Sequence, residues 1–255
     1  MTRSDDFLGG RLRLTQPVTG YRAGTDAVLL AAACPARTGQ SVLDLGCGAG
    51  AALLCLGVRV PGLVLTGLER DETVAELART NAVAAGLPAR IVTGEVERMP
   101  VALRAESFDH VVTNAPFFGS GTPAPDPYRA AARHEATPLP AWVDAGLRRL
   151  RPGGRLTLIH RAERLDAILV ALAGRAGDVV ILPIAARAGR AAGRVIVAAR
   201  KGARGPLRLL APLVLHAAAR HLHDGEDLTP AAQAVLRNAA PLDLRTGEIP
   251  VTGGV

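Results

Sequence analysis

The chain has 255 residues and a formal net charge of +7, and 49% of its residues are hydrophobic and 21% charged. These proportions supply a full core and exclude a disordered chain. The 3 cysteines are too few for a disulfide framework. No apolar run reaches the ~18 residues of a transmembrane helix. The first residues also lack the basic and apolar regions of a secretory signal, so we expect one cytoplasmic domain that does not contact a membrane.

Short β-rich apolar runs alternate along the chain with Ala- and Leu-rich stretches, the pattern of βαβ units around a parallel sheet. Seven strands are predicted, over Ser41–Leu45, Leu63–Glu69, Arg90–Thr93, Phe108–Thr113, Gly154–Ile159, Val179–Pro183 and Arg194–Ala199. Six helices are predicted, over Asp26–Cys34, Ala51–Val60, Asp71–Ala85, Pro140–Leu150, Arg161–Gly174 and Pro230–Asn238. The fold class is therefore α/β, with a seven-stranded, mostly parallel sheet and helices on both faces.

A glycine-rich turn joins the first predicted strand to the helix that follows it. Its three glycines, at alternate positions, are Gly46, Gly48 and Gly50. Such a turn lets a ligand approach the backbone and presents N–H groups at a helix start. The dinucleotide fingerprint would need glycine at position 51, which is Ala51. Asp44 at the strand end would repel a pyrophosphate and suits an ammonium group, although a purely structural turn is the alternative.

Carboxylates also follow the next two predicted strands. Glu69 ends its strand about 20 residues past the turn, where a carboxylate binds ribose hydroxyls in Rossmann-type sites. Gly94 and Glu95 follow the third strand, where they could reach an adenine edge. Charged residues at strand ends can also be plain surface. Together the three strand tips resemble the S-adenosylmethionine-dependent class I methyltransferases, which implies a Rossmann-like fold and S-adenosyl-L-methionine as cofactor.

The fourth predicted strand runs into Asn114, Ala115, Pro116 and Phe117. This tetrapeptide resembles the N-P-P-[YF] signature of methyltransferases that act on planar amino nitrogens, and it implies catalysis by these four residues. The exocyclic nitrogen of adenine is a poor nucleophile, so two acceptors for its hydrogens, the Asn114 side chain and the Ala115 carbonyl, would direct its lone pair to the methyl group. Phe117 would stack on the base. The alternative is a strand-ending turn with core phenylalanines.

Alanine stands at position 115, where the signature has proline. Proline would fix φ and with it the carbonyl direction. Ala115 precedes Pro116, which still favours an extended conformation. Whether the alanine impairs catalysis stays open at this point.

The resemblance extends over the whole chain. The stretches Phe7–Gly10, Gln16–Ala31, Arg151–Gly154, Arg194–Gly202 and Pro212–His216 resemble the bacterial tRNA1(Val) adenine-37-N6-methyltransferase-like family. The family implies a single methyltransferase domain over 1–255, with a cap over 1–35, a Rossmann-like core over 36–205 and a C-terminal extension over 206–255. It also implies N6-methylation of an adenine in tRNA, and no metal. The residues that it implies for cofactor binding are Tyr21, Arg22, Gly24, Thr25, Asp44, Gly46, Cys47, Gly48, Gly50, Glu69, Arg70, Gly94, Glu95 and Asn114.

Positive charge gathers late in the chain, between positions 179 and 223. Eight basic residues and no Asp or Glu lie there, so the remaining residues sum to −1. A basic segment on a nearly neutral body favours a nucleic acid partner, although a solvated arginine-rich face is the bland alternative. The residues expected to bind RNA are Arg187, Arg190, Arg194, Arg200, Lys201 and Arg204.

Two further groups of residues stand out in the sequence. Arg129, Arg133, His134 and Glu135 lie in a long loop that could order over a flipped base. His216, His221 and His223 have no cysteine partner, which argues against zinc.

Two other functions stay open on the sequence. One is a protein glutamine N5-methyltransferase, which uses a similar tetrapeptide. The other is a catalytically impaired protein that binds cofactor and RNA. The sequence does not indicate an oligomeric state.

Overall fold

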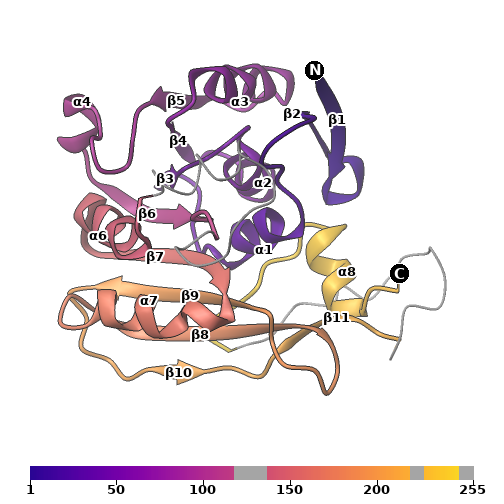
Figure 1. Cartoon of the computed structure of the whole chain (residues 1–255), viewed down its shortest axis with the longest axis vertical. Helices are drawn as coiled ribbons and strands as arrows, with labels where there is room; N and C mark the ends of the chain where they lie inside the picture. The colour runs from indigo at the N-terminus through magenta and orange to yellow at the C-terminus, as the bar shows by residue number, and fades with distance from the viewer. Residues whose placement is uncertain (118–136, 219–226, 247–255) are drawn as a thin grey trace, which may run out of the picture.

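The computed structural model describes residues 1–117, 137–218 and 227–246 (Figure 1). The elements, in chain order, are β1 (Thr2–Phe7), η1 (Leu8–Gly10), β2 (Leu12–Pro17), α1 (Thr25–Ala33), β3 (Ser41–Leu45), α2 (Ala51–Arg59), β4 (Val64–Glu69), α3 (Glu72–Ala84), β5 (Ala89–Thr93), α4 (Val101–Arg104), β6 (Phe108–Thr113), α6 (Leu139–Arg149), β7 (Leu150–Arg161), η2 (Ala162–Arg164), α7 (Leu165–Leu172), β8 (Ala176–Arg187), β9 (Arg194–Lys201), β10 (Arg208–Leu209), β11 (Leu213–His216) and α8 (Pro230–Leu236).

One large sheet runs through the molecule in the order β10-β8-β9-β7-β6-β3-β4-β5, with β11 also paired to β8. Strands β7, β6, β3, β4 and β5 are parallel, and β9 runs antiparallel to both β7 and β8. All seven predicted strands form. Two short strands, β10 and β11, pair with the edge of β8 and bring the sheet to nine strands. The sequence did not predict them, because each has only a few residues and such a short run carries no readable period. Pro206 and Pro212 flank β10.

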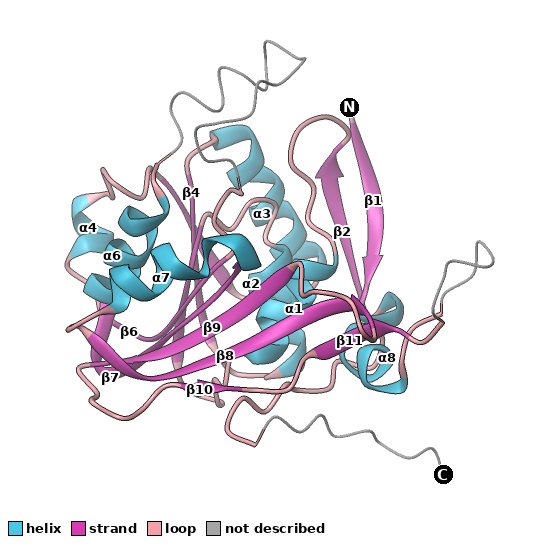
Figure 2. Cartoon of the chain, turned by 60° about the horizontal axis from the view of Figure 1, so that its bottom comes forward, coloured by secondary structure: helices cyan, strands magenta, loops and turns pink. Residues whose placement is uncertain are grey.

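Helices cover both faces of this sheet, and each face has its own apolar core (Figure 2). The strands alternate between the two cores as the period of a strand requires. Val42 and Val112 point to the side of α1, α2 and α3, whereas Leu43 and Val111 point to the side of α4, α6 and α7. None of the helices within the described ranges is long and apolar enough to cross a bilayer.

The chain begins with an antiparallel hairpin, β1–β2, that the sequence did not predict as strands. Strand β1 reads Thr-Arg-Ser-Asp-Asp-Phe and has almost no apolar period. The hairpin packs Phe7, Leu12 and Leu14 into the core. Polar contacts add to this: Asn81 of α3 accepts from the Thr15 N–H at 2.8 Å and donates to the Thr15 carbonyl at 2.9 Å. Buried Gln16 bonds both backbone groups of Ala23 in the segment after the hairpin. The hairpin thereby positions residues 20–26.

The topology fixes where a ligand can bind. From β3 the chain proceeds through β4 to β5 at one edge, whereas β6 lies on the other side of β3 and leads to β7. The carboxyl ends of β3 and β6 therefore form the switch point at which open α/β sheets bind ligands. The Thr113 hydroxyl donates to the Leu45 carbonyl at 3.0 Å and ties the two strand ends together.

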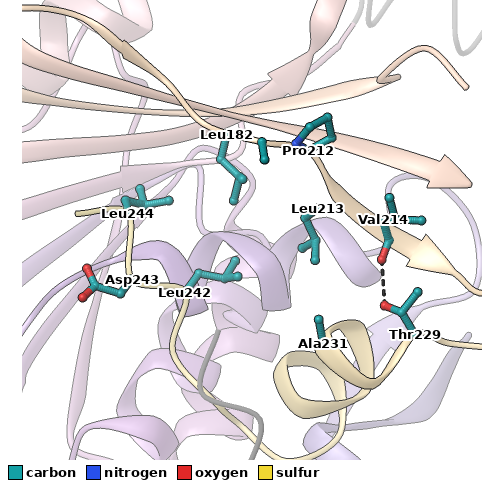
Figure 3. A pocket seen from close by; sticks show the side chains of 10 residues that line it. Leu182, Pro212, Leu213, Val214, Thr229, Ala231, Leu242, Asp243 and Leu244 are labelled. Carbon is teal, nitrogen blue, oxygen red and sulfur yellow. Dashed lines mark hydrogen bonds between the residues drawn. The ribbon is translucent and has the colours of Figure 1, made fainter. Parts of the chain in front are cut away.

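An apolar cavity of about 310 Å³ lies far from this switch point, between β8, β11 and α8 (Figure 3). Leu182, Leu213 and Leu242 line it, and Thr229 beside it donates to the Val214 carbonyl at 2.7 Å. Its lining is mostly hydrophobic and includes none of the residues predicted to bind the cofactor.

Candidate active site

The glycine turn lies at the carboxyl end of β3, as its sequence predicts. The N–H groups of Gly46 and Cys47 both donate to the Leu68 carbonyl, at 2.8 and 3.0 Å. Gly46 has φ +70°, and a Cβ there would lie 2.7 Å from the Trp142 ring. Gly48 has φ +55° but open space around the position of a Cβ. Trp142 and the turn conformation therefore require glycine at 46, whereas the space at Gly48 is free for a ligand.

Glu69 at the end of β4 braces this turn. One carboxylate oxygen accepts from the Gly48 N–H at 2.9 Å, and the other accepts from the Asp71 N–H at 3.0 Å. Carboxylate oxygens have further lone pairs, so Glu69 can still accept from a ligand hydroxyl.

Asp44 is the unusual carboxylate of the site. It is only 2% exposed, and its Oδ2 atom is buried with no hydrogen-bond partner. Burial, with the negative charge of Glu69 added, raises the pKa of Asp44 to about 8. A buried acceptor without a partner is costly, and a cationic group of a ligand would satisfy it.

The third strand tip is arranged around Gly94, whose N–H donates to the Glu69 carbonyl at 2.8 Å. A Cβ on Gly94 would come within 2.6 Å of the Pro100 ring. Glu95 and Arg70 are exposed at the same edge. The structure thus brings Asp44, Glu69 and Glu95 to neighbouring strand ends, as the sequence predicts.

The tetrapeptide directly follows β6, beside the glycine turn. Asn114 donates from Nδ2 to the Tyr21 hydroxyl at 2.7 Å, and its Oδ1 is buried without a partner. Tyr21 itself is exposed over 61% of its surface. Ala115 is 2% exposed and Pro116 is exposed. An empty acceptor therefore stands at the point where the sequence predicts one.

Phe117, the last residue of the tetrapeptide, is half-buried between two other side chains. His160 at the end of β7 meets it edge-on, with ring centroids 5.0 Å apart at 84°. Burial lowers the pKa of His160 to about 4, which keeps this ring neutral. The Arg194 guanidinium lies over the Phe117 ring, 4.7 Å from its centroid, and its Nε atom pairs with Asp26 at 3.1 Å.

The N-terminal residues expected at the cofactor site have different contacts in the structure. Tyr21 reaches Asn114, whereas Arg22 pairs with Asp5 of β1 at 2.9 Å. Gly24 precedes α1 as its N-terminal cap residue, and Thr25 begins the helix and is exposed. Arg22 thus holds the hairpin against this segment.

Three residues of the site were not predicted from the sequence. His160 of β7 contacts the Phe117 ring, and Asp26 of α1 pairs with Arg194, which lies over that ring. Buried Asn81 donates to the Ala49 carbonyl of the glycine turn at 2.9 Å. A polar residue directly after an apolar predicted strand, as His160 is after Gly154–Ile159, is the signal that could have indicated a role. Asp26 carries no comparable signal, because its partner is 168 positions away.

The basic segment does not form one surface. Arg187, Arg190 and Arg194 lie at the carboxyl end of β8 and the start of β9, the same edge as the tetrapeptide. Arg200, Lys201 and Arg204 lie at or past the other end of β9. We call these two groups the site-edge arginines and the far-edge cations.

Contacts within the two groups also differ. Arg187 pairs with Asp227 at 2.7 Å, whereas Arg190 is exposed and has no acidic partner within the described residues. Among the far-edge cations, Arg200 donates to the Gly153 carbonyl at 3.2 Å and Lys201 to the Leu150 carbonyl at 2.7 Å. The expected RNA-binding residues therefore include several with structural partners.

The histidine cluster is only partly covered by the structure. His216 bonds Asp227 at 2.6 Å. Within 1–117, 137–218 and 227–246 no three His, Cys, Asp or Glu side chains could hold a metal ion. His221, His223 and the loop residues Arg129, Arg133, His134 and Glu135 lie outside the described residues.

The parallel sheet, its switch point and the acidic strand tips around a glycine turn define a class I S-adenosylmethionine-dependent methyltransferase. Residues 22–170 match the family described as methyltransferase small domain. A Porphyromonas gingivalis protein named tRNA1(Val) (adenine(37)-N6)-methyltransferase is 39% identical over 171 residues, which cover 64% of this chain and 67% of that protein. A protein of the same name from Aeromonas hydrophila is 31% identical over 208 residues, covering 79% of this chain and 86% of that protein. The chain belongs to the methyltransferase small-domain family and to the tRNA1(Val) adenine-N6-methyltransferase-like group that these relatives represent.

Solved structures agree on the fold. A predicted O-methyltransferase from Agrobacterium tumefaciens superposes with a TM-score of 0.66 at 28% identity, covering 82% of this chain and 94% of that chain. A 16S rRNA N2 G1207 methyltransferase from T. thermophilus, solved with AdoMet and guanosine, gives a TM-score of 0.53 at 22% identity, over 79% of this chain and 50% of that chain. The second likeness concerns the fold alone.

Proposed function

We propose that this methyltransferase methylates the exocyclic N6 nitrogen of an adenine in tRNA. The observation that carries the proposal is the Asn114 Oδ1 atom, which is buried without a partner three residues before Phe117 in the tetrapeptide. An acceptor and an aromatic ring in one tetrapeptide suit a planar base that bears an amino group. The names of the relatives support tRNA as the substrate.

Asn114 and Ala115 make the amine reactive in this proposal. Conjugation with the ring delocalises the N6 lone pair, so the amine is a weak nucleophile. Asn114 Oδ1 and the Ala115 carbonyl would accept its two hydrogens and turn the lone pair out of the ring plane. Catalysis is then mainly positioning, and no strong base is needed because the methylated amine becomes acidic.

The residues at the strand tips fit S-adenosyl-L-methionine. The buried Asp44 Oδ2 lacks a partner and suits the ammonium group of an amino acid, and the space at Gly48 admits a ligand next to the backbone. Glu69 would accept from ribose hydroxyls, and the Gly94–Glu95 tip would meet the adenine edge. When bound, the cofactor supplies an electrophilic methyl group on its sulfonium.

Phe117 would receive the target base. An adenine in structured RNA must leave its stack to reach such a site, and stacking on an aromatic side chain compensates for about 1–3 kcal/mol of that cost. Phe117 is half-buried, so part of the residue remains accessible. His160, held neutral, adds no charge to the base site.

Arg190 is the best candidate for contact with the RNA backbone. It lies on the tetrapeptide edge, is exposed, and has no acidic partner among the described residues. The far-edge cations lie at the opposite end of β9, away from a base held at Phe117. The cytoplasmic location and the domain boundaries stay predictions.

The test is transfer of radiolabelled methyl groups from S-adenosylmethionine to bulk tRNA, followed by mass analysis of the nucleosides. The proposal predicts N6-methyladenosine as the labelled nucleoside. Label on a protein glutamine instead would identify a glutamine N5-methyltransferase. Binding of cofactor and RNA with no transfer would identify a catalytically impaired protein, and both outcomes would reject the proposal.

A further inference from the structure

We infer that Arg194 is a positioning residue that holds Phe117 for the base, and that it does not contact the RNA backbone. The inference rests on the proposed function, because it assigns Phe117 the role of stacking on the target base. It reassigns a residue that the charge pattern groups with the RNA-binding cations.

Arg194 makes three contacts with described residues of the chain. The Nε atom pairs with Asp26 Oδ2 at 3.1 Å, and Nη1 donates to the Gly193 carbonyl at 3.2 Å. The guanidinium plane lies over Phe117, 4.7 Å from the ring centroid. Arg194 and Asp26 are both partly shielded, with side-chain exposures of 36% and 24%. The positive charge is thus already matched by a carboxylate and an aromatic face.

Phe117 needs such support because of where it stands in the chain. It follows β6 by four residues and, within the described part of the chain, belongs to no strand or helix itself. His160 contacts the ring perpendicularly, and Arg194 contacts it from above. Two side chains from β7 and β9 therefore hold the ring that β6 alone leaves unsupported.

The connection runs through three distant parts of the chain. Asp26 belongs to α1, Arg194 begins β9, and Phe117 follows β6. Asp26 holds the Arg194 guanidinium in place, and the guanidinium in turn restricts the Phe117 ring. Loss of Arg194 should therefore act on RNA binding only through Phe117, and it should leave the electrostatic contribution to binding unchanged.

A double-mutant cycle on tRNA affinity tests this connection, with the full chain and S-adenosylhomocysteine present. Arg194→Ala should weaken tRNA binding about 3- to 30-fold, the span between an exposed and a desolvated cation–π contact, because Arg194 is only partly shielded. In the Phe117→Ala background the same change should cost less than about twofold, because the ring it supports is gone. Arg194→Lys, which keeps a cation, should recover part of the loss, and Asp26→Asn should reproduce part of it with Arg194 intact.

The salt dependence of tRNA binding separates positioning from phosphate contact. Arg194→Ala should leave the slope of log K against log[salt] unchanged, whereas Arg190→Ala, four residues earlier, is the control that should reduce its magnitude by about 0.7–0.9. Equal losses from Arg194→Ala in both backgrounds, or a reduced slope, would overturn the inference. A wild type that binds tRNA without methylating it would reject the proposed function, while the binding cycle would still report on Arg194.

Discussion

Asp44 allows a test of the cofactor site that needs no RNA. Its carboxylate is 2% exposed with one unpartnered oxygen, and its pKa is raised to about 8 by burial and by Glu69. At pH 7 the ligand-free protein therefore holds Asp44 about nine-tenths protonated. An ammonium group beside it favours the ionised form, so binding of S-adenosylmethionine should release close to one proton.

The released proton makes the affinity depend on pH. Between about pH 5.5 and 7.5 the dissociation constant should fall by up to about tenfold per pH unit. Asp44→Asn keeps the shape but cannot ionise, so it should bind the cofactor about 10- to 150-fold more weakly at pH 7, as expected for one charged hydrogen bond. Its affinity should no longer change steeply with pH.

Titration calorimetry in two buffers with different ionisation enthalpies counts the protons directly. The wild type should release about 0.9 proton at pH 7 and Asp44→Asn none. Zero release by the wild type, or the same release by both proteins, would refute the assignment of Asp44 to the ammonium group.

The same carboxylate affects the stability of the ligand-free protein. The native pKa of about 8 lies above the unfolded value near 3.8, so the native state binds the extra proton and stability falls as pH rises through this window. Asp44→Asn removes that fall. As pH rises, the free energy of unfolding of Asp44→Asn relative to the wild type should therefore increase by up to about 1.4 kcal/mol per pH unit. Urea denaturation at several pH values measures the difference.

Three further predictions concern the turn, the RNA surface and the tetrapeptide. Gly48→Val should abolish cofactor binding in calorimetry, because the side chain fills the ligand space. The control is Gly39→Val, which is also at positive φ with open surroundings but lies at the other end of the sheet, and it should bind the cofactor normally. Equal binding by both variants would show that Gly48 is not part of the site. Arg190→Ala should lower the salt slope of tRNA binding by about 0.7–0.9, whereas Arg204→Ala at the far edge should leave it unchanged, and the reverse result would place the RNA on the far edge. Ala115→Pro should leave the methylation rate unchanged or raise it slightly, because Pro116 already favours the extended conformation, and an inert wild type revived by this change would mean that Ala115 impairs the enzyme.

The sequence was most informative at the carboxyl ends of β3, β4 and β6. Asp44, Glu69 and Asn114 each directly end or follow a strand whose apolar run is readable, and parallel strands bring their carboxyl ends to one edge. Local pattern and general topology therefore suffice to group these residues. The same reasoning placed all seven main strands.

Contacts between distant segments could not be predicted in this way. Asp26 and Arg194 are 168 positions apart, and they meet because β9 runs antiparallel and begins at the edge where β7 ends. The charge count placed Arg194 with Arg200, although β9 separates them by its whole length. Counting charges along the sequence does not show at which edge of the sheet each charged residue lies.

The N-terminal hairpin was missed for a different reason. Its first strand carries two aspartates and an arginine and has almost no apolar period, and polar contacts such as Asp6–Arg13 at 2.8 Å and those of Asn81 add to the packing of the hairpin. Strand prediction depends on such a period. The second strand does alternate, with Leu12 and Leu14 buried, and at 6 residues it is no shorter than the predicted strand Ser41–Leu45, so its period could have been read.

The central claim is that Asn114 orients the target amine through a side-chain oxygen. Its most direct test is the single-turnover rate of N6-methyladenosine formation in tRNA by Asn114→Ala and by wild type, each saturated with S-adenosylmethionine. Loss of one of two preorganised groups should slow transfer about 10²–10³-fold, while the cofactor dissociation constant changes little. Transfer by Asn114→Ala at the wild-type rate would contradict the claim.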